Sequence, residues 1–265
     1  MKRLLLPAML FFALSAFSQM KEGKIVYERV IQIPIRNFNI DPAIAAQIPK
    51  SRTDQYELLF GNNQSLWQYL PNATNDGDGN SFSSGGMGFR FNAGNNDVTY
   101  CNFEKGTRID QREIADKSYV VSDSIRKLVW KLSDETKTIL NYPVRKATST
   151  RVSTRMQMSM ENGVMKREPV QDTSVVVAWI TTDIPVSVGP EFQGQLPGAI
   201  LELDIANGQT VYKAIEVSPK VSLNKIKEPK DGKKMSAEQF AKEREKVMEE
   251  MRRNMPAGNT IRIQQ

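Results

Sequence analysis

The sequence predicts a mainly β protein: one antiparallel sheet, strongly curved or forming a half-open barrel, with a single C-terminal α-helix. First, about ten to twelve short segments between Gly23 and Val221 alternate apolar and polar residues or are rich in β-branched and aromatic residues. Second, polar turn residues separate these segments and no helical period lies between them, which argues against a βαβ arrangement. Third, only the C-terminal part of the chain has the period of an amphipathic helix.

The first segment, Gly23–Ile33, shows how the sheet is assigned. Its residues Ile25, Tyr27, Arg29 and Ile31 alternate with others, so their side chains share one side of an extended chain. Such a period of two is typical of a strand with one face against a core.

Hairpin turns are expected at residues 61–63, 133–136, 161–163 and 207–208, where Gly, Asn, Ser, Asp or Glu interrupt the strand patterns. Asn207 and Gly208 favour a type I′ turn, because both residues tolerate a positive φ.

The first 18 residues have the character of a secretory signal peptide. Lys2 and Arg3 precede the apolar run Leu4–Phe17, and small residues lie just before a cut at Gln19. The run has about 14 residues, fewer than the roughly 20 that span a bilayer. We therefore expect cleavage, export to the periplasm or the medium, and no transmembrane segment in the mature chain.

The Gly-, Asn- and Ser-rich segment 71–97 is expected to be a long exposed loop. Within it, Asp76, Asp78 and Asn80 have the spacing of the first three ligands of an EF-hand calcium loop. The Gly required at the sixth position is absent, and Met87 replaces the bidentate Glu at the twelfth. These departures favour a loop over a calcium site.

Residues 19–221 are expected to form the β domain, and 222–265 a charged linker followed by the helix. Ser236 and Gln239 have the spacing of a capping box, which places the start of the helix at Ser236. Four apolar side chains then fall near one face: Phe240, Val247, Met251 and Met255. This face either packs onto the sheet or binds an acidic membrane surface or another protein.

The chain carries a formal charge of +6, and much of the positive charge lies in the C-terminal tail. The predicted β domain is close to balanced, so we expect no nucleic-acid partner.

Composition excludes several kinds of chemistry. The chain has no His, which excludes Ser-His-Asp and Cys-His catalysis and argues against a catalytic zinc or copper site. Cys101 is the only cysteine, so no internal disulfide can form; it is either a buried, inert thiol or a reactive one. The acidic clusters lie in turn-like contexts, so we expect no enzyme, no cofactor and no metal site.

The segment RMQMSM places Met156, Met158 and Met160 on one face of a strand. Thioethers can bind Cu(I), but three on one strand face are more typical of an apolar lining, which in a curved sheet could face a ligand cavity.

The segments WKLSDETKTILNYPVRKAT and VVAWITTDIPVSVGPEFQGQLPGAILEL together resemble the GLPGLI family of exported Bacteroidota proteins. The residues that carry the resemblance most clearly are Trp130, Asp134, Glu135, Lys137, Tyr142, Trp179, Pro185, Gly189, Pro190, Leu196, Pro197, Gly198 and Glu202. The name motif departs at Gln195 and Ala199, which replace its first Gly and its second Leu. The resemblance implies export and a shared fold, with no catalytic residues to carry over.

Within the motif, Pro197 and Gly198 suit positions i+1 and i+2 of a type II turn that leads into a strand, with Leu196 filling the core beneath. We therefore expect these motif residues to act structurally.

Three function classes follow from the sequence. The first is a non-enzymatic binding or carrier protein for an apolar or amphiphilic ligand such as a lipid, supported by the Met face and by Trp67, Trp130 and Trp179. The second is a structural or protein-interaction component of the cell envelope, associated with an outer-membrane system. An enzyme that works without His comes last.

Overall fold

The computed structural model describes residues 19–33, 49–71, 81–84, 87–90, 97–114, 117–161 and 164–254. Within them the strands are β1 (Gly23–Gln32), β2 (Ser51–Gly61), β3 (Gln64–Leu70), β4 (Ser81–Ser84), β5 (Met87–Arg90), β6 (Val98–Asn102), β7 (Thr107–Ile114), β8 (Lys117–Ser124), β9 (Lys131–Ile139), β10 (Tyr142–Glu161), β11 (Val164–Thr181), β12 (Ala199–Ile205), β13 (Thr210–Ser218) and β14 (Lys233–Ser236). The helices are the 3₁₀ turn η1 (Leu223–Lys225) and α2 (Ala237–Asn254).

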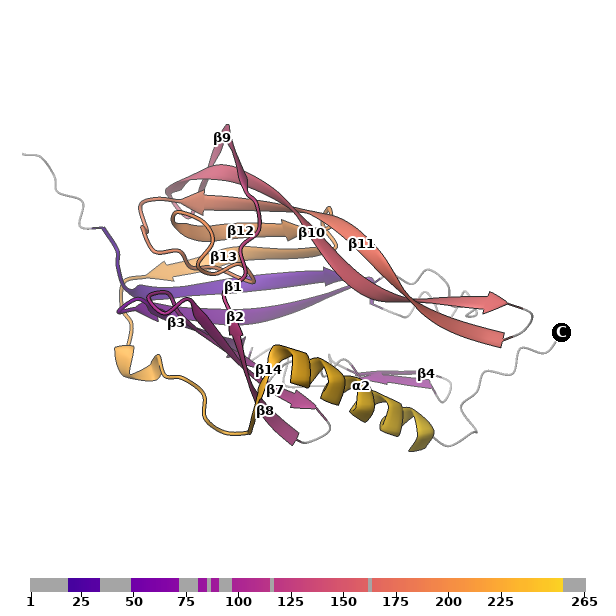
Figure 1. Ribbon diagram of the computed structural model, residues 1–265. Helices are drawn as coiled ribbons and strands as arrows, with labels where there is room; N and C mark the ends of the chain where they lie inside the picture. Colours follow the sequence, from indigo (N-terminus) through magenta and orange to yellow (C-terminus); the bar gives the residue numbers. More distant parts are fainter. Residues whose placement is uncertain are drawn as a thin grey trace, which may run out of the picture.

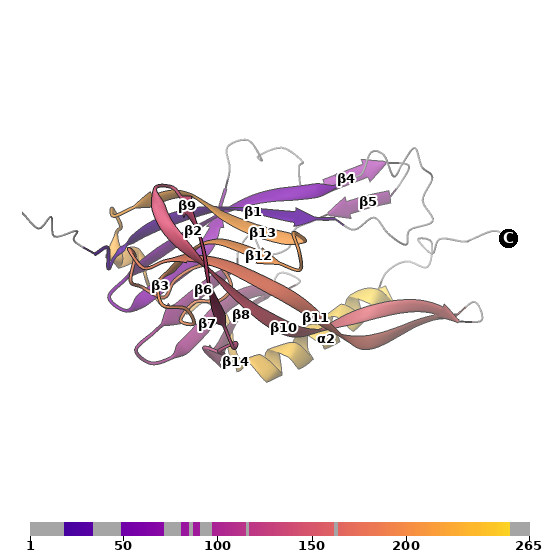
Figure 2. The same cartoon turned by 90° about the horizontal axis from the view of Figure 1, so that it is seen from above.

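Twelve of these strands form one open sheet in the order β14-β8-β7-β6-β3-β2-β1-β13-β12-β11-β10-β9. Neighbours pair antiparallel, except β14, which runs parallel to β8. Figures 1 and 2 show the strong twist and curvature of the sheet, with α2 beside its β8–β14 end. The predicted fold class is confirmed: the protein is mainly β, the sheet does not close, and one α-helix lies near the C-terminus.

The main core lies on one face of the sheet. Alternate residues of the central strands are fully buried there, among them Ile25, Tyr27 and Leu58. The segment that connects β11 to β12 also enters this core, where Ile184 and Val188 are fully buried. The Tyr27 hydroxyl donates to the backbone oxygen of Ile200 at 2.6 Å, so a phenol buried in the core has its hydrogen-bond partner.

A second cluster lies on the opposite face, because Leu59 alternates with Leu58 along β2. Leu59 packs there with Leu66, Tyr100 and Ile109 of β3, β6 and β7. The connection after β13 covers this cluster with Ile226, so both faces of this part of the sheet are buried.

Two of the expected hairpin turns are confirmed, at 61–63 and 207–208. Asn62 and Asn63 have φ values of 51° and 57°, and Asn207 and Gly208 have 52° and 86°. Positive φ at both central residues is what a type I′ turn requires. The turn expected at 161–163 lies partly outside the described residues, although Glu161 and the first residue of β11 are paired.

The turn expected at 133–136 was wrong. Strand β9 runs through this segment, and the hairpin turns instead at Leu140 and Asn141, with φ values of 48° and 67°. Two acidic residues of the segment form ion pairs with the neighbouring strand β10. The Asp134 carboxylate pairs with Arg145 at 2.8 Å, and the Glu135 carboxylate pairs with Lys146 at 2.9 Å. Such cross-strand ion pairs suit exposed strand residues as well as turn residues.

The type II turn at Pro197–Gly198 was also wrong. The Gly198 N–H donates to the Leu196 oxygen at 2.9 Å, which makes a three-residue turn centred on Pro197. The Ala199 N–H, which would close a type II turn, instead donates to the Ile184 oxygen at 3.1 Å.

The segment 71–97 contains the β4–β5 hairpin, so it is not a continuous loop. The residues of the calcium hypothesis, Asp76, Asp78 and Asn80, lie outside the described residues, as does the expected signal peptide at 1–18.

The segment 222–235 is not only a linker. It contains η1, buries Ile226, and reaches β14, which extends the sheet beyond the predicted domain boundary at residue 221. The β-sheet pattern was missed because a four-residue strand with the sequence KKMS has no clear period of two.

The capping box is confirmed, because Ser236 N–H donates to Gln239 Oε1 at 2.9 Å and Gln239 N–H to Ser236 Oγ at 3.3 Å. Helix α2 packs on the sheet through Phe240 and Val247, and the rings of Phe240 and Tyr119 lie 5.5 Å apart. Neither helix in the described part of the chain has the length and apolarity that a membrane span needs.

Candidate binding site

The segment 182–198, which contains the whole of the sequence GPEFQGQLPG, lies against the core face of the sheet. Its Val188, Phe192 and Leu196 side chains are buried in the main core. Internal hydrogen bonds fix its path: Gly194 N–H donates to the Ser187 oxygen at 2.7 Å, and the Ser187 hydroxyl to the Leu196 oxygen at 2.6 Å. We call this segment the inner loop.

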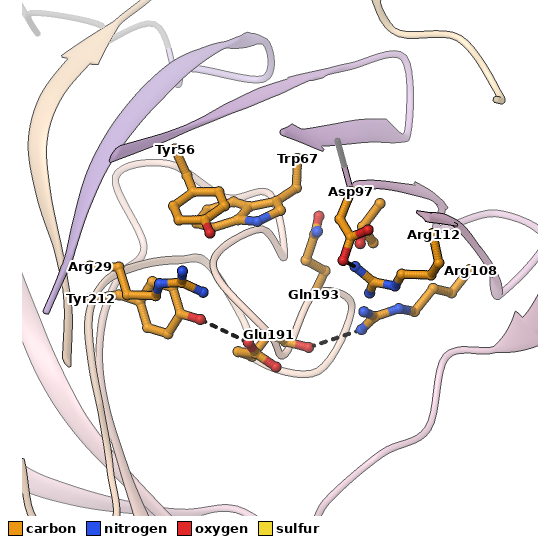
Figure 3. A pocket seen from close by; sticks show the side chains of 10 residues that line it. Arg29, Tyr56, Trp67, Asp97, Arg108, Arg112, Glu191, Gln193 and Tyr212 are labelled. Carbon is orange, nitrogen blue, oxygen red and sulfur yellow. Dashed lines mark hydrogen bonds and ion pairs between the residues drawn. The ribbon is translucent and has the colours of Figure 1, made fainter. Parts of the chain in front are cut away.

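A pocket of about 280 Å³ lies between the inner loop and the sheet (Figure 3). Most of its lining comes from polar or aromatic residues of β1, β2, β3, β6, β7 and β13 and from the inner loop. These residues are Arg29, Tyr56, Trp67, Asp97, Thr99, Arg108, Arg112, Glu191, Gln193 and Tyr212.

Strand register explains why the sheet residues meet. Leu58, Trp67, Thr99 and Asp110 are successive cross-strand partners on β2, β3, β6 and β7. Directly paired residues of antiparallel strands point to the same face, so this row lies on the face of Leu58, which is the core face.

One wall of the pocket is aromatic. The rings of Tyr56 and Trp67 stack with centroids 5.0 Å apart and an interplanar angle of 11°. The Tyr212 ring meets Trp67 edge-on at 5.9 Å, and the Arg29 guanidinium lies 4.7 Å from the centre of the Tyr56 ring. Burial raises the pKa of Tyr56 to about 12, so its hydroxyl stays protonated at neutral pH.

The inner loop contributes Glu191, whose backbone has a φ of 60°. Its carboxylate accepts a hydrogen bond from the Tyr212 hydroxyl at 2.8 Å, and its backbone oxygen accepts one from Arg108 at 3.3 Å (Figure 3). Burial and the neighbouring Glu191 carboxylate raise the pKa of Tyr212 well above its ordinary value, which keeps the phenol a donor.

The remaining walls consist of ion pairs. Asp54, which is 1% exposed, binds Arg29 at 2.6 Å and Arg52 at 2.7 Å. Arg112 bridges two carboxylates, Asp97 at 2.8 Å and Asp110 at 2.9 Å.

Asp110 is held by two guanidinium groups, because Arg108 also contacts it at 2.9 Å. Burial acts to raise the pKa of Asp110, but Arg108 and Arg112 outweigh burial and hold this pKa below its ordinary value.

Asp110→Asn is therefore expected to lower the free energy of unfolding at neutral pH, and the difference from wild type should vanish in acid. A carboxyl group whose pKa is lowered by folding contributes stability above its unfolded pKa of about 3.9 and loses it as the pH falls through the folded pKa. Urea unfolding of both proteins from neutral pH down to about pH 2 measures this. A difference that stays constant with pH would contradict the assignment.

A larger cavity of about 610 Å³ adjoins the pocket and shares Arg108, Glu191 and Gln193 with it. It is also lined by residues that precede β9, by the inner loop and by the first turns of α2. Cys101 lies at this cavity. The thiol is buried, as one of the two sequence alternatives expected, and burial raises its pKa to about 11, so it is protonated at neutral pH.

None of the motif residues named above lines either cavity. The carboxylates of Asp134 and Glu135 pair across the β9–β10 hairpin, whereas Lys137 reaches Glu202 at 2.8 Å and lies 4.3 Å from the centre of the Trp179 ring. Tyr142 is partly buried against the main core, and Pro185 is exposed near the start of the inner loop. The ion pairs connect β9 with β10 and with β12.

Trp130 and the remaining motif residues support the inner loop. The Trp130 ring meets Phe192 edge-on at 5.4 Å, and its Nε1–H donates to Gln195 Oε1 at 3.2 Å. The other motif residues lie within the inner loop: Gly189, Pro190, Leu196, Pro197 and Gly198. These motif residues therefore shape the loop that forms one wall of the site.

The residues of the proposed apolar lining lie on β10. Register pairs Met156, Met158 and Met160 with the part of β11 that has neither β9 nor β12 beside it. This half of the β10–β11 hairpin projects from the sheet (Figure 2), and the side chains of these three residues lie outside the described part of the structure.

Sequence reasoning picked out Trp67 but missed the other residues of the pocket. One signal was present: Arg29 shares a strand face with Ile25 and Tyr27, and a charge on an apolar strand face needs a buried partner. No comparable pattern marks Glu191 or Gln193, whose positions depend on the fold of the inner loop. Among the described residues, no three carboxylate or thiol side chains are grouped as ligands for a metal ion.

Comparisons with known proteins bear on the fold and on one segment. Residues 130–202 match a family model described as a protein of unknown function (Porph_ging). This match covers β9, β10, β11 and the inner loop, and of the pocket residues it includes only Glu191 and Gln193. A search of curated proteins found no match.

Two solved structures of PNGF-II, in the P21 and C2 space groups, resemble the chain with TM-scores of 0.52 and 0.50. Each is 17% identical; the alignments cover 86% and 85% of this chain, and 34% and 33% of the PNGF-II chains. The chain thus spans about a third of their length, and at this identity the likeness shows the fold alone. The comparisons therefore support a β-rich fold and relate residues 130–202 to a family whose function is unknown.

Proposed function

We propose that the protein is an exported, non-enzymatic binding protein that takes up a neutral, hydroxyl-rich ligand, such as a sugar unit, in the pocket beside Trp67. The observation that carries this proposal is the pocket wall itself, in which fixed and balanced charges surround a stacked aromatic pair. The proposal of export rests on the N-terminal sequence, and that of kinship with GLPGLI proteins on the motif residues.

The charges at the pocket are balanced. Three guanidinium groups and two carboxylates line it: Arg29, Arg108 and Arg112, with Asp97 and Glu191. Outside the lining, Asp54 pairs with Arg29 and Arg52, and Asp110 pairs with Arg108 and Arg112, so that four guanidinium groups meet four carboxylates in all. A ligand with net charge would upset this balance, and an apolar ligand would remove the polar groups from water without replacing their hydrogen bonds. A hydroxyl group both donates and accepts, so a ligand with several hydroxyls can use guanidinium donors and carboxylate acceptors together. The expectation of an apolar ligand therefore fits this pocket poorly.

The aromatic wall supplies the complementary surface. A sugar ring has C–H groups that pack against an aromatic side chain, while its hydroxyls lie at the ring edge. Trp67 is held by Tyr56 on one side and meets Tyr212 edge-on, so its position is fixed before a ligand arrives. Such preorganisation lowers the entropic cost of binding.

The state of the carboxylates supports binding over catalysis. Asp97 and Asp110 each accept from guanidinium groups, and Glu191 accepts from Tyr212. A carboxylic acid that donates a proton at neutral pH needs a raised pKa, whereas that of Asp110 is lowered.

Calorimetric titration with a panel of common neutral mono- and disaccharides tests the proposal. We expect millimolar or tighter binding of at least one sugar, and about tenfold weaker binding by Arg112→Gln, which removes charged donors from the pocket wall. Arg145→Gln is the matched control, because Arg145 pairs with Asp134 away from both cavities. The proposal fails if no sugar binds at millimolar concentration, if the two variants bind alike, or if fatty acids or lysophospholipids bind in place of sugars.

An envelope interaction protein is the second candidate, favoured by the projecting half of the β10–β11 hairpin. Within the described residues no third strand pairs with this half, and Val152 and Val175 are 61% and 46% exposed on it. A stoichiometric partner that is captured by the full chain and lost when Val152 and Val175 are both changed to Thr would favour this candidate.

A further inference from the structure

We propose that the larger cavity beside α2 is a second subsite continuous with the first, so that the protein binds a linear chain of at least two neutral polar units. This inference rests on the proposed function and specifies its ligand. It follows from the way the two cavities adjoin, from the charges of the second cavity and from the small residues that α2 presents there.

The two cavities are direct neighbours. Arg108, Glu191 and Gln193 belong to the walls of both, so these three residues form the boundary between them. The Arg108 guanidinium and the backbone oxygen of Glu191 meet at 3.3 Å between the two cavities, where sheet and inner loop come together (Figure 3). A single sugar unit beside Trp67 would leave the larger of the two spaces, about 610 Å³ against about 280 Å³, without a ligand.

The second cavity combines polar and apolar surface in the same way as the first. The Phe192 ring, fixed by Trp130, gives it an apolar wall, and Arg126 pairs with Asp123 at 3.1 Å along its rim. Gln195 is held in one orientation, because its Oε1 accepts from Trp130 Nε1–H and from the Leu128 N–H at 2.9 Å. Fixed polar groups beside an aromatic face again suit a hydroxyl-bearing ring.

The charged residues at the second cavity restrict the class of ligand further. Four carboxylates and two guanidinium groups line it: Asp110, Asp123, Glu191 and Glu238, with Arg108 and Arg126. Two further cations pair with these carboxylates from outside the lining, Arg112 with Asp110 and Lys242 with Glu238, so the charges balance as they do at the first pocket. The cavity therefore offers no net positive charge to an acidic unit, so the second unit is neutral and uronic acids are disfavoured.

The wall formed by α2 has one position, Ala241, at which a larger side chain would fill part of the second cavity and so test the subsite. Ala241 lines the cavity and is exposed, so a larger side chain at this position would enter the cavity without displacing a buried residue. The helix itself is anchored by Phe240 and Val247 on another side, which keeps the wall in place.

The experiment measures affinity against chain length for Ala241→Trp and for Lys246→Trp, an exposed position of the same helix that lines neither cavity. The probes are linear homo-oligomers of one to four units of glucose, mannose, galactose and N-acetylglucosamine. For wild type and Lys246→Trp we expect at least one series in which the dimer binds about tenfold more tightly than the monomer. Ala241→Trp should lose this gain while keeping the monomer affinity, with an unchanged thermal midpoint.

Monomer binding that does not improve with length, or an equal gain in both variants, overturns the second subsite and leaves the proposed function standing. Failure of all four series, monomers included, overturns both. Tighter binding of oligo-uronic acids than of the neutral oligomers contradicts the charge argument.

Discussion

Replacing Gly198 with Val is expected to lower the free energy of unfolding by about 4 kcal/mol or more, among the largest effects of a single substitution. A Cβ atom at this position would lie 2.1 Å from the backbone oxygen of Thr181 and 2.9 Å from its carbonyl carbon. The backbone of Gly198 also has a φ of 135°, a value that residues other than Gly rarely adopt. Because the obstacle is backbone, the inner loop or the end of β11 must move. Urea unfolding followed by Trp fluorescence measures the change.

Two control substitutions test whether the close approach to Thr181 is the main cause of the lost stability. Gly208 also has a positive φ, but a Cβ there meets nothing within 4 Å, so Gly208→Val should cost only about 1–2 kcal/mol of backbone strain. Gln195→Gly restores the residue of the GLPGLI motif but removes the acceptor for Leu128 and Trp130, and should cost about 1–3 kcal/mol. Equal melting temperatures for the Gly198 and Gly208 variants would show that the close approach to Thr181 is not decisive.

Replacing Asp54 with Ala should destabilise the protein by about 3–5 kcal/mol. Asp54 is buried and pairs with Arg29 and Arg52, whose side chains are 16% and 12% exposed. Removing this carboxylate takes away the ion pair that Asp54 makes with each of two largely buried guanidinium groups, and losing a buried ion pair is far more costly than losing a surface one. Since Arg29 lines the pocket, sugar binding should weaken as well.

Asp134→Ala is the matched control, because this carboxylate also pairs with an Arg but is fully exposed. We expect no measurable change in its unfolding midpoint, since solvent screens surface ion pairs. Indistinguishable midpoints for the Asp54 and Asp134 variants would contradict the assigned role of burial. Asp54→Asn, which keeps one acceptor oxygen, should fall between the two.

The local features of the fold followed from the sequence. Alternation in β1 reported its buried face, because strand side chains alternate with a period of two whatever lies beside them. The turns at Asn62–Asn63 and Asn207–Gly208 and the capping box at Ser236 depend on the backbone preferences of a few adjacent residues.

The failed predictions share a cause. Asp134 and Glu135 suit a turn by composition, but Arg145 and Lys146 on the neighbouring strand stabilise them in β9. The Ala199 N–H donates to the Ile184 oxygen, and the sequence preferences of turns do not describe a hydrogen bond between residues so far apart in the chain. Strand β14 is too short to show a period of two. It forms because its backbone pairs with that of β8.

Residue type and short spacing were therefore enough to predict the fold class, the helix with its cap and two of the turns. The site could not be predicted in this way. Its residues come from six strands and the inner loop, and sheet register and curvature bring together side chains as distant in sequence as Arg29, Arg108 and Glu191. Because of the same long-range packing, the inner loop, which connects β11 to β12 along the chain, also forms one wall of the pocket.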